Sequence, residues 1–223
     1  MTYKFDFTAV FEAWPLLLTG TLHTLLFSAC AMAFGLVIAI LGALGKLSAP
    51  MPIRFLISAY VEIIRNTPFP VQLFFFYFGL PTLGIRLSPD VTSILALTLN
   101  FAAYGIEIVR AGILSIPRGQ IEAGRALGLE PLHIFRYVVL KPAVQNIYPA
   151  LTSQFILTML YSSVCSTIAA TELTGAANDI TSRTFRNFEG YFTVTVIYFL
   201  LSAFFWTLFS AIERRLLARP QVG

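Results

Sequence analysis

Residues 119–142 read GQIEAGRALGLEPLHIFRYVVLKP, a polar and basic stretch between apolar runs that are long enough to cross a bilayer. Residues 120–127 are good helix formers and predict a short helix with Glu122 and Arg125 paired at i, i+3. Gly128 is a residue that can end this helix in a left-handed conformation, and Pro131 one that can begin the next. Since loops between membrane spans are usually short, an ordered loop of this kind indicates a docking surface for another protein.

The composition indicates an all-α integral membrane protein. Hydrophobic residues make up 57% of the 223 residues and charged residues only 12%, whereas soluble domains carry about a quarter charged residues. Cys30 and Cys165 both lie inside apolar runs, so we expect small buried side chains rather than a disulfide or a metal site. We expect no cleaved signal peptide and no nucleic-acid partner.

Five apolar runs predict five transmembrane helices in a single membrane domain over residues 1–223. They cover residues 16–45, 55–80, 91–114, 148–170 and 191–212, and each approaches or exceeds the ~20 residues that cross the hydrocarbon core. Residues 1–15 predict a short helix in the outer membrane interface. Its apolar face would hold Phe7, Val10, Phe11 and Trp14.

Positive charges predict the orientation of these spans. With the N-terminus outside and the C-terminus inside, ten Lys and Arg residues fall on inner segments and four on outer segments. The inner ones are Lys46, Arg54, Arg110, Arg118, Arg125, Arg136, Lys141, Arg214, Arg215 and Arg219, and the outer ones are Lys4, Arg86, Arg183 and Arg186. We therefore expect an N-out/C-in topology with residues 119–142 in the cytoplasm.

Arg65 lies inside the second apolar run, roughly 16 Å along a helix from Arg54 and thus near the middle of the bilayer. Pro68 and Pro70 follow and disrupt the helix, which frees backbone carbonyls. Broken helices at this depth are typical of substrate sites in transporters. One interpretation places Arg65, Asn66 and Thr67 along a translocation path. The other pairs Arg65 with Glu62 one turn earlier and makes the prolines a simple kink.

The fourth run offers a second wall of such a path at Tyr161 and Ser162. Ser and Thr in membrane spans more often bond to their own helix backbone, and for Ser162 we favour that role. Glu107 and Arg110 predict a structural ion pair, and His23 a packing residue. Glu172, just beyond the fourth run, is expected to be solvated or to contact another protein.

The chain contains no P-loop for ATP. Such a loop needs Gly, four residues and then Gly-Lys-Ser/Thr. Gly45-Lys46 is the candidate, but Leu47 follows it and Ile40 holds the position of the first Gly. If ATP drives this protein, another chain must bind the nucleotide.

Three blocks of sequence together resemble one family, the permease subunits of polar amino acid ATP-binding-cassette (ABC) importers of the histidine/glutamine/arginine type. The first is the coupling-loop pattern of Glu122, Ala123, Gly124 and Gly128, followed by Val138 and Leu140. The others are RNTPFPVQLFFFYFGLP at 65–81 and LNFAAYGIEIVRAGILSIPRGQIEA at 99–123.

The chain departs from the family pattern at three places. Lys141 stands between Leu140 and Pro142, where the family has Pro directly after Leu. Gly124 replaces Ala, which loosens the helix by up to ~1 kcal/mol. Leu160, Tyr161 and Ser162 stand where several such permeases carry Lys-Asp-Thr, so the acidic group for a cationic substrate is missing.

The resemblance implies a type I ABC importer permease fold in a bacterial cytoplasmic (inner) membrane, without catalytic residues, cofactor or metal in this chain. It implies a coupling helix that contacts a dimer of cytoplasmic ATP-binding subunits, which hold ATP and Mg. The contact would use Glu122, Ala123, Gly124, Arg125 and Gly128. It also implies a second permease subunit, the same chain or a related one, and an extracytoplasmic amino-acid-binding protein.

Two other classes of function remain open at this point. One is a secondary transporter driven by an ion gradient, although such proteins usually have paired repeats and more spans. The other is an intramembrane hydrolase, for which Ser162 with His23 would be the nucleophile and base. The sequence does not identify the amino acid.

Overall fold

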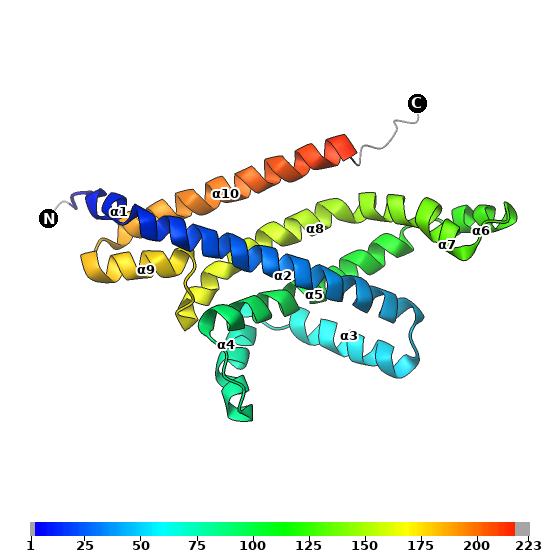
Figure 1. Ribbon diagram of the computed structural model, residues 1–223, viewed down its shortest axis with the longest axis horizontal. Coiled ribbons are helices and arrows are strands. Elements are labelled where there is room, and N and C mark those ends of the chain that lie inside the picture. Colours follow the sequence, from blue (N-terminus) through cyan, green and yellow to red (C-terminus); the bar gives the residue numbers. More distant parts are fainter. Residues whose placement is uncertain (1–2, 217–223) are drawn as a thin grey trace.

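The computed structural model describes residues 3–216, and these residues form helices and turns without a β-strand. Four helices extend along the long axis of the molecule (Figure 1). They are α2 (Trp14–Ser48), α5 (Pro89–Leu114), α8 (Lys141–Tyr161) and α10 (Asn187–Leu216). Among the described residues, four helical segments are long and apolar enough to cross a membrane, and they correspond to these four helices.

The second apolar run forms two shorter helices, α3 (Met51–Arg65) and α4 (Phe69–Gly79), followed by the 3₁₀ turn η1 (Leu80–Leu83). The break falls at the expected prolines, because Pro68 is extended with φ −65° and ψ 138°. The two helices have 15 and 11 residues, so each alone is shorter than the ~20 residues of a span. Figure 1 shows α4 projecting away from the long axis.

The two ends of the molecule carry different elements. Helices α1 (Thr8–Glu12) and α9 (Leu173–Thr184) lie at the end that holds the N-terminus, and α6 (Arg118–Ala126) and α7 (Pro131–His133) lie at the opposite end (Figure 1). The last turns of α10 also lie toward the end of α6 and α7. Arg219, one of the charges used for the orientation, lies outside the described residues.

The N-terminal segment contains a short helix, and one residue of its expected apolar face is buried. Its helix α1 has only five residues. Phe11 is 71% exposed, but Val10 is 1% exposed and packs with Leu17 and Leu173. Val10 therefore packs against the protein while Phe11 stays exposed, and the position of this helix in the outer membrane interface stays a prediction.

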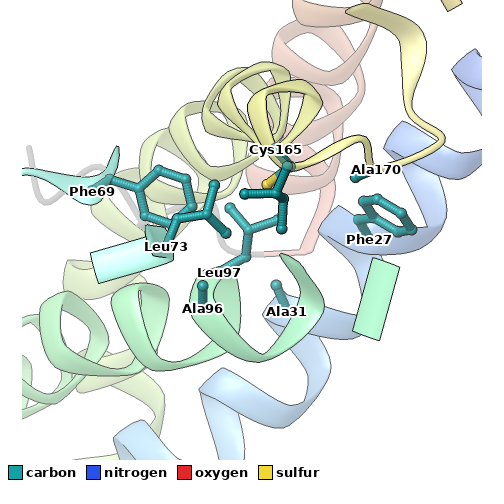
Figure 2. Packing of buried hydrophobic residues seen from close by; sticks show 9 residues of the cluster. Phe27, Ala31, Phe69, Leu73, Ala96, Leu97, Cys165 and Ala170 are labelled. Atoms are coloured by element: carbon teal, nitrogen blue, oxygen red, sulfur yellow. The ribbon is translucent and has the colours of Figure 1, made fainter. Parts of the chain in front are cut away.

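The central core joins α2, α4, α5 and the 3₁₀ segment η3 (Ser162–Ile168). Figure 2 shows Phe27 and Ala31 from α2 near Ala96 and Leu97 from α5, with Phe69, Leu73 and Cys165 around them. Cys165 is buried as expected and Cys30 is half-buried, and both are free thiols.

Helices α2 and α5 approach closely because small residues line their crossing. A Cβ added at Gly105 would lie 2.7 Å from the Ala39 Cβ, and one at Gly35 would lie 2.7 Å from Phe101 Cδ1. Small residues at helix crossings are the usual way in which membrane helices gain packing energy, since lipid is as apolar as the side chains.

Candidate functional site

Polar side chains at the break between α3 and α4 bind carbonyl groups in the last turn of α3. The Asn66 side-chain amide donates to the Glu62 carbonyl at 2.8 Å, and the Thr67 hydroxyl donates to the Ile63 carbonyl at 2.8 Å. A carbonyl without a partner is costly in an apolar environment. Two of the residues expected along the path, Asn66 and Thr67, thus use polar atoms to cap the end of α3.

The Gln72 side chain spans the break from α4. Its amide nitrogen donates to the carbonyl oxygens of Ile64 at 2.7 Å and Thr67 at 2.9 Å, and lies 3.0 Å from the Thr67 hydroxyl. Its oxygen accepts a 2.9 Å hydrogen bond from the Asn100 amide of α5. Gln72 and Asn100 are 6% and 4% exposed. This buried amide pair ties both sides of the break to α5.

Sequence reasoning missed Gln72 and Asn100, although both lie in the blocks quoted for the family resemblance. A signal was present, because each is a lone amide among apolar residues, in PVQLFFF and LTLNFAA. Buried side-chain amides need partners. Periodicity alone did not show that these two would meet.

Arg65 is exposed at the end of α3, and its guanidinium lies 5.4 Å from the centre of the Tyr104 ring. Glu62 instead accepts a 3.0 Å hydrogen bond from Asn66. The described part of the chain contains no ion pair between Arg65 and Glu62, so the structural alternative for Arg65 is not observed. The cation is held by an aromatic face and remains open to an anionic group.

Tyr161 and Ser162, at the junction of α8 and η3, have different surroundings. The Tyr161 ring stacks on Phe69 at the start of α4, with centroids 5.6 Å apart and planes 9° apart. Ser162 is fully buried, and its hydroxyl donates to the Met159 carbonyl at 2.7 Å. Tyr161 therefore joins the wall around the break. The favoured role of Ser162, a bond to its own helix, is confirmed.

The loop between α5 and α8 is ordered by the expected residues. Helix α6 ends in a Schellman motif, in which Leu129 N–H donates to the Gly124 carbonyl at 3.1 Å and Gly128 N–H donates to the Arg125 carbonyl at 2.9 Å. Gly128 has a φ of +73°, in the left-handed region. Pro131 begins α7. The predicted roles of Gly128 and Pro131 are confirmed.

Helix α6 presents a polar surface at the tip of the molecule. Glu122, Ala123 and Arg125 are exposed, whereas Gly124 is buried. A Cβ at Gly124 would lie 3.2 Å from Ile134 Cγ1, so this glycine serves packing within the loop. The expected ion pair between Glu122 and Arg125 is not formed in the described part of the chain, because both side chains point to solvent. Both charges are thus available to another protein.

Two buried or half-buried glutamates have structural partners. Glu107 bonds to Arg110 at 2.7 Å, as expected, and also to Lys46 of α2 at 2.7 Å. The expectation for Glu172 is wrong: it is fully buried and caps α9 by accepting from Thr174 N–H at 2.8 Å and Gly175 N–H at 2.7 Å. Burial raises the pKa of the Glu172 carboxyl.

His23 is a packing residue, as expected. Its Nδ1 lies 2.7 Å from the Thr171 carbonyl oxygen, and its ring stacks on Phe27. Ser162 bonds to Met159 instead, so the described residues contain no contact between the serine and the histidine. Ser162 and His23 therefore do not form the pair of nucleophile and base that the hydrolase alternative requires.

Comparisons with known proteins agree with this geometry. The chain is 34% identical to the glutamine transport system permease protein GlnP of Escherichia coli over 215 residues, covering 96% of this chain and 98% of the relative. It is 35% identical to the L-cystine transport system permease protein TcyB of Bacillus subtilis over 208 residues, covering 91% of this chain and 87% of the relative.

A solved structure described as an amino acid ABC transporter with histidines has 38% sequence identity and a TM-score of 0.90, covering 96% of this chain and 100% of that chain. Residues 31–218 match the family described as the binding-protein-dependent transport system inner membrane component. The match covers most of the chain and includes the broken helix and the loop that holds α6. The chain therefore belongs to the family of binding-protein-dependent transport system inner membrane components.

Proposed function

We propose that this chain is the membrane-spanning, non-catalytic subunit of an ATP-driven importer for a polar amino acid, in a bacterial cytoplasmic membrane. The observation that carries the proposal is the combination of two features in one member of this family. A broken helix with an available Arg65 lies within the helical bundle, and an exposed polar helix, α6, lies at one end. The similarity to glutamine and L-cystine permeases supports an amino acid as the substrate.

The proposed topology has five spans with the N-terminus outside and the C-terminus inside. The spans are α2, α3 together with α4, α5, α8 and α10. Lys and Arg residues support this orientation, since they gather at the end with α6 and the α2–α3 turn. The placement of α1 and α9 at one end and α6 and α7 at the other is consistent with it (Figure 1).

The two ends of the molecule, one on each side of the membrane, suggest different protein partners. At the inner end, α6 would dock on a dimer of cytoplasmic subunits that bind ATP and Mg, through Glu122, Ala123, Arg125 and Gly128, with Gly124 supporting the loop. At the outer end, a soluble binding protein would deliver the amino acid. A second permease subunit, the same chain or a related one, would complete the pore. The need for an ATPase partner distinguishes the proposed importer from the alternative of a transporter driven by an ion gradient.

The substrate path would run past the break between α3 and α4. In this proposal Arg65 offers a cation to the α-carboxylate, while Asn66, Thr67 and Tyr161 shape the wall and Ser162 supports it from behind. A charged side chain within the bilayer is costly, and such residues usually mark a substrate or ion pathway. The stacking of Arg65 on Tyr104 favours this role, because it holds the guanidinium without neutralising it.

A charge reversal on α6 tests the coupling surface. Glu122→Lys places a cation where the proposal needs an acidic contact, so uptake should fall by about tenfold or more while the subunit still inserts. Glu130→Lys is the matched control, because Glu130 is also exposed in this loop but lies outside α6. ATP-driven uptake by proteoliposomes and stimulated ATP hydrolysis are measured. Equal activity of the Glu122 variant and the wild type would refute the docking assignment.

Cysteine accessibility tests the topology. In a background without Cys30 and Cys165, single cysteines are placed at Ser48, Ser88, Gly119 and Asp179. A membrane-impermeant thiol reagent added to cells whose outer face is accessible should label Ser88→Cys and Asp179→Cys only. The other two cysteines should react after the membrane is opened. Labelling of Gly119→Cys in sealed cells would rule out the proposed orientation.

Removal of the Arg65 charge tests the path. Arg65→Ala should lower uptake by about tenfold or more, since a charged hydrogen bond contributes about 1.5–3 kcal/mol. Arg65→Lys should retain part of the activity. Arg54→Ala, on the same helix but at its start, should transport normally. Complex yield and binding-protein affinity are measured to show that assembly and capture are intact.

A structural role for Arg65 predicts a different set of results. The complex would then lose yield with Arg65→Ala, and the double variant Glu62→Gln with Arg65→Gln would regain both yield and uptake. Full transport by that double variant would exclude a direct contact between Arg65 and the substrate.

A further inference from the structure

An apolar cavity of about 270 Å³ lies between α2, α5 and the start of α8, in the half of the bundle nearest to α6. Its lining side chains are all apolar and include Leu36, Ile40, Val109, Phe135, Leu140 and Val144. Ile40, Phe135 and Leu140 are 42%, 40% and 43% exposed. The cavity is therefore bordered by apolar side chains at the surface of the chain.

The segment between α7 and α8 is a π-helix, η2 (Ile134–Leu140). The wider turn of a π-helix, with its i to i+5 hydrogen bonds, brings residues five apart toward the same side of the helix, whereas an α-helix sets them roughly 140° apart. Phe135 and Leu140 have this spacing, and both line the cavity. The residues that follow them, Arg136 and Lys141, have the same spacing. The π-helix and the first residue of α8 thus place two cations beside a pair of apolar side chains.

Arg136 and Lys141 are free to bind an external anion. Both are exposed, and neither has an ion pair in the part of the chain that the structure describes. The Arg136 guanidinium lies 5.7 Å from the centre of the Tyr137 ring, and Tyr137 is 65% exposed. Tyrosine and basic residues are the side chains that gather at the lipid headgroup level. Lys141 is also the residue that separates Leu140 from Pro142 and departs from the family pattern.

We propose that this place is a binding site for an anionic phospholipid. One acyl chain lies in the apolar cavity, and the headgroup phosphate is bound by Arg136 and Lys141. The charge and the apolar lining together favour a lipid over a free phosphate, which would leave the cavity without a ligand. The site rests on the proposed insertion of the chain in a bilayer with α6 at a membrane surface, and it is independent of the solute that the importer carries.

A tryptophan reporter tests the site. The chain contains two tryptophans, and Trp14→Phe with Trp206→Phe removes both. Phe135→Trp then places one fluorophore at the cavity. The full-length chain is reconstituted into phosphatidylcholine vesicles with a small fraction of dibrominated phosphatidylglycerol, or of dibrominated phosphatidylcholine, whose bromines quench a nearby indole.

The proposal predicts that brominated phosphatidylglycerol quenches the reporter with on the order of 25-fold higher apparent affinity than brominated phosphatidylcholine, at about fivefold for each of the two basic side chains. Arg136→Gln with Lys141→Gln should abolish this preference. Arg54→Gln, which removes one exposed cation near the same end of the molecule, should retain it.

Two results would overturn the proposal. Equal quenching by both lipids would mean that only general lipid contacts reach the cavity. Quenching by neither lipid would mean that protein, and not lipid, covers the cavity. Uptake is not a readout here, so loss of the lipid preference and failure of the importer assignment can be told apart.

Discussion

The hydrogen bonds from the Gln72 amide across the broken helix are the constraint on which the site depends. A chain that breaks inside a membrane must satisfy the freed carbonyls within the protein. Gln72 binds those of Ile64 and Thr67, and Asn100 anchors Gln72 to α5. This arrangement lets α4 turn away from the bundle and leaves Arg65 beside Tyr104 with its charge free. Phe69 and Leu73, on the same side of the break, complete the central core (Figure 2).

Helix α5 connects the two candidate functional regions of the molecule. Asn100 and Tyr104 contact the break, and one to two turns later Glu107 binds both Lys46 of α2 and Arg110. The helix ends at Leu114, four residues before α6 begins at Arg118. A docking partner at α6 would therefore act next to the end of α5, the helix whose Asn100 and Tyr104 contact the break. This gives a physical route by which ATP hydrolysis in a partner could move the break.

The sequence predicted local features well and long-range contacts poorly. Gly128, Pro131 and the two prolines of the break act within a few residues of their own positions, so their backbone chemistry was sufficient. The partnership of Gln72 with Asn100 depends on how α4 meets α5, which no local pattern encodes. Glu172 was expected at the surface because it follows an apolar run, but α9 folds back and buries it as a cap. The Glu122–Arg125 spacing allowed an ion pair that exposed side chains gain little by forming.

The most direct test of this account is the ATP-driven uptake of Gln72→Met in reconstituted complexes. Methionine keeps most of the volume of glutamine but donates no hydrogen bond, so the Ile64 and Thr67 carbonyls lose their partner at a cost of about 1–3 kcal/mol each. Phe75→Met is the control, since Phe75 lies on the same helix and is 69% exposed. The account predicts that Gln72→Met loses most uptake and melts at a lower temperature, while the control transports normally. Wild-type uptake and stability in Gln72→Met would contradict it.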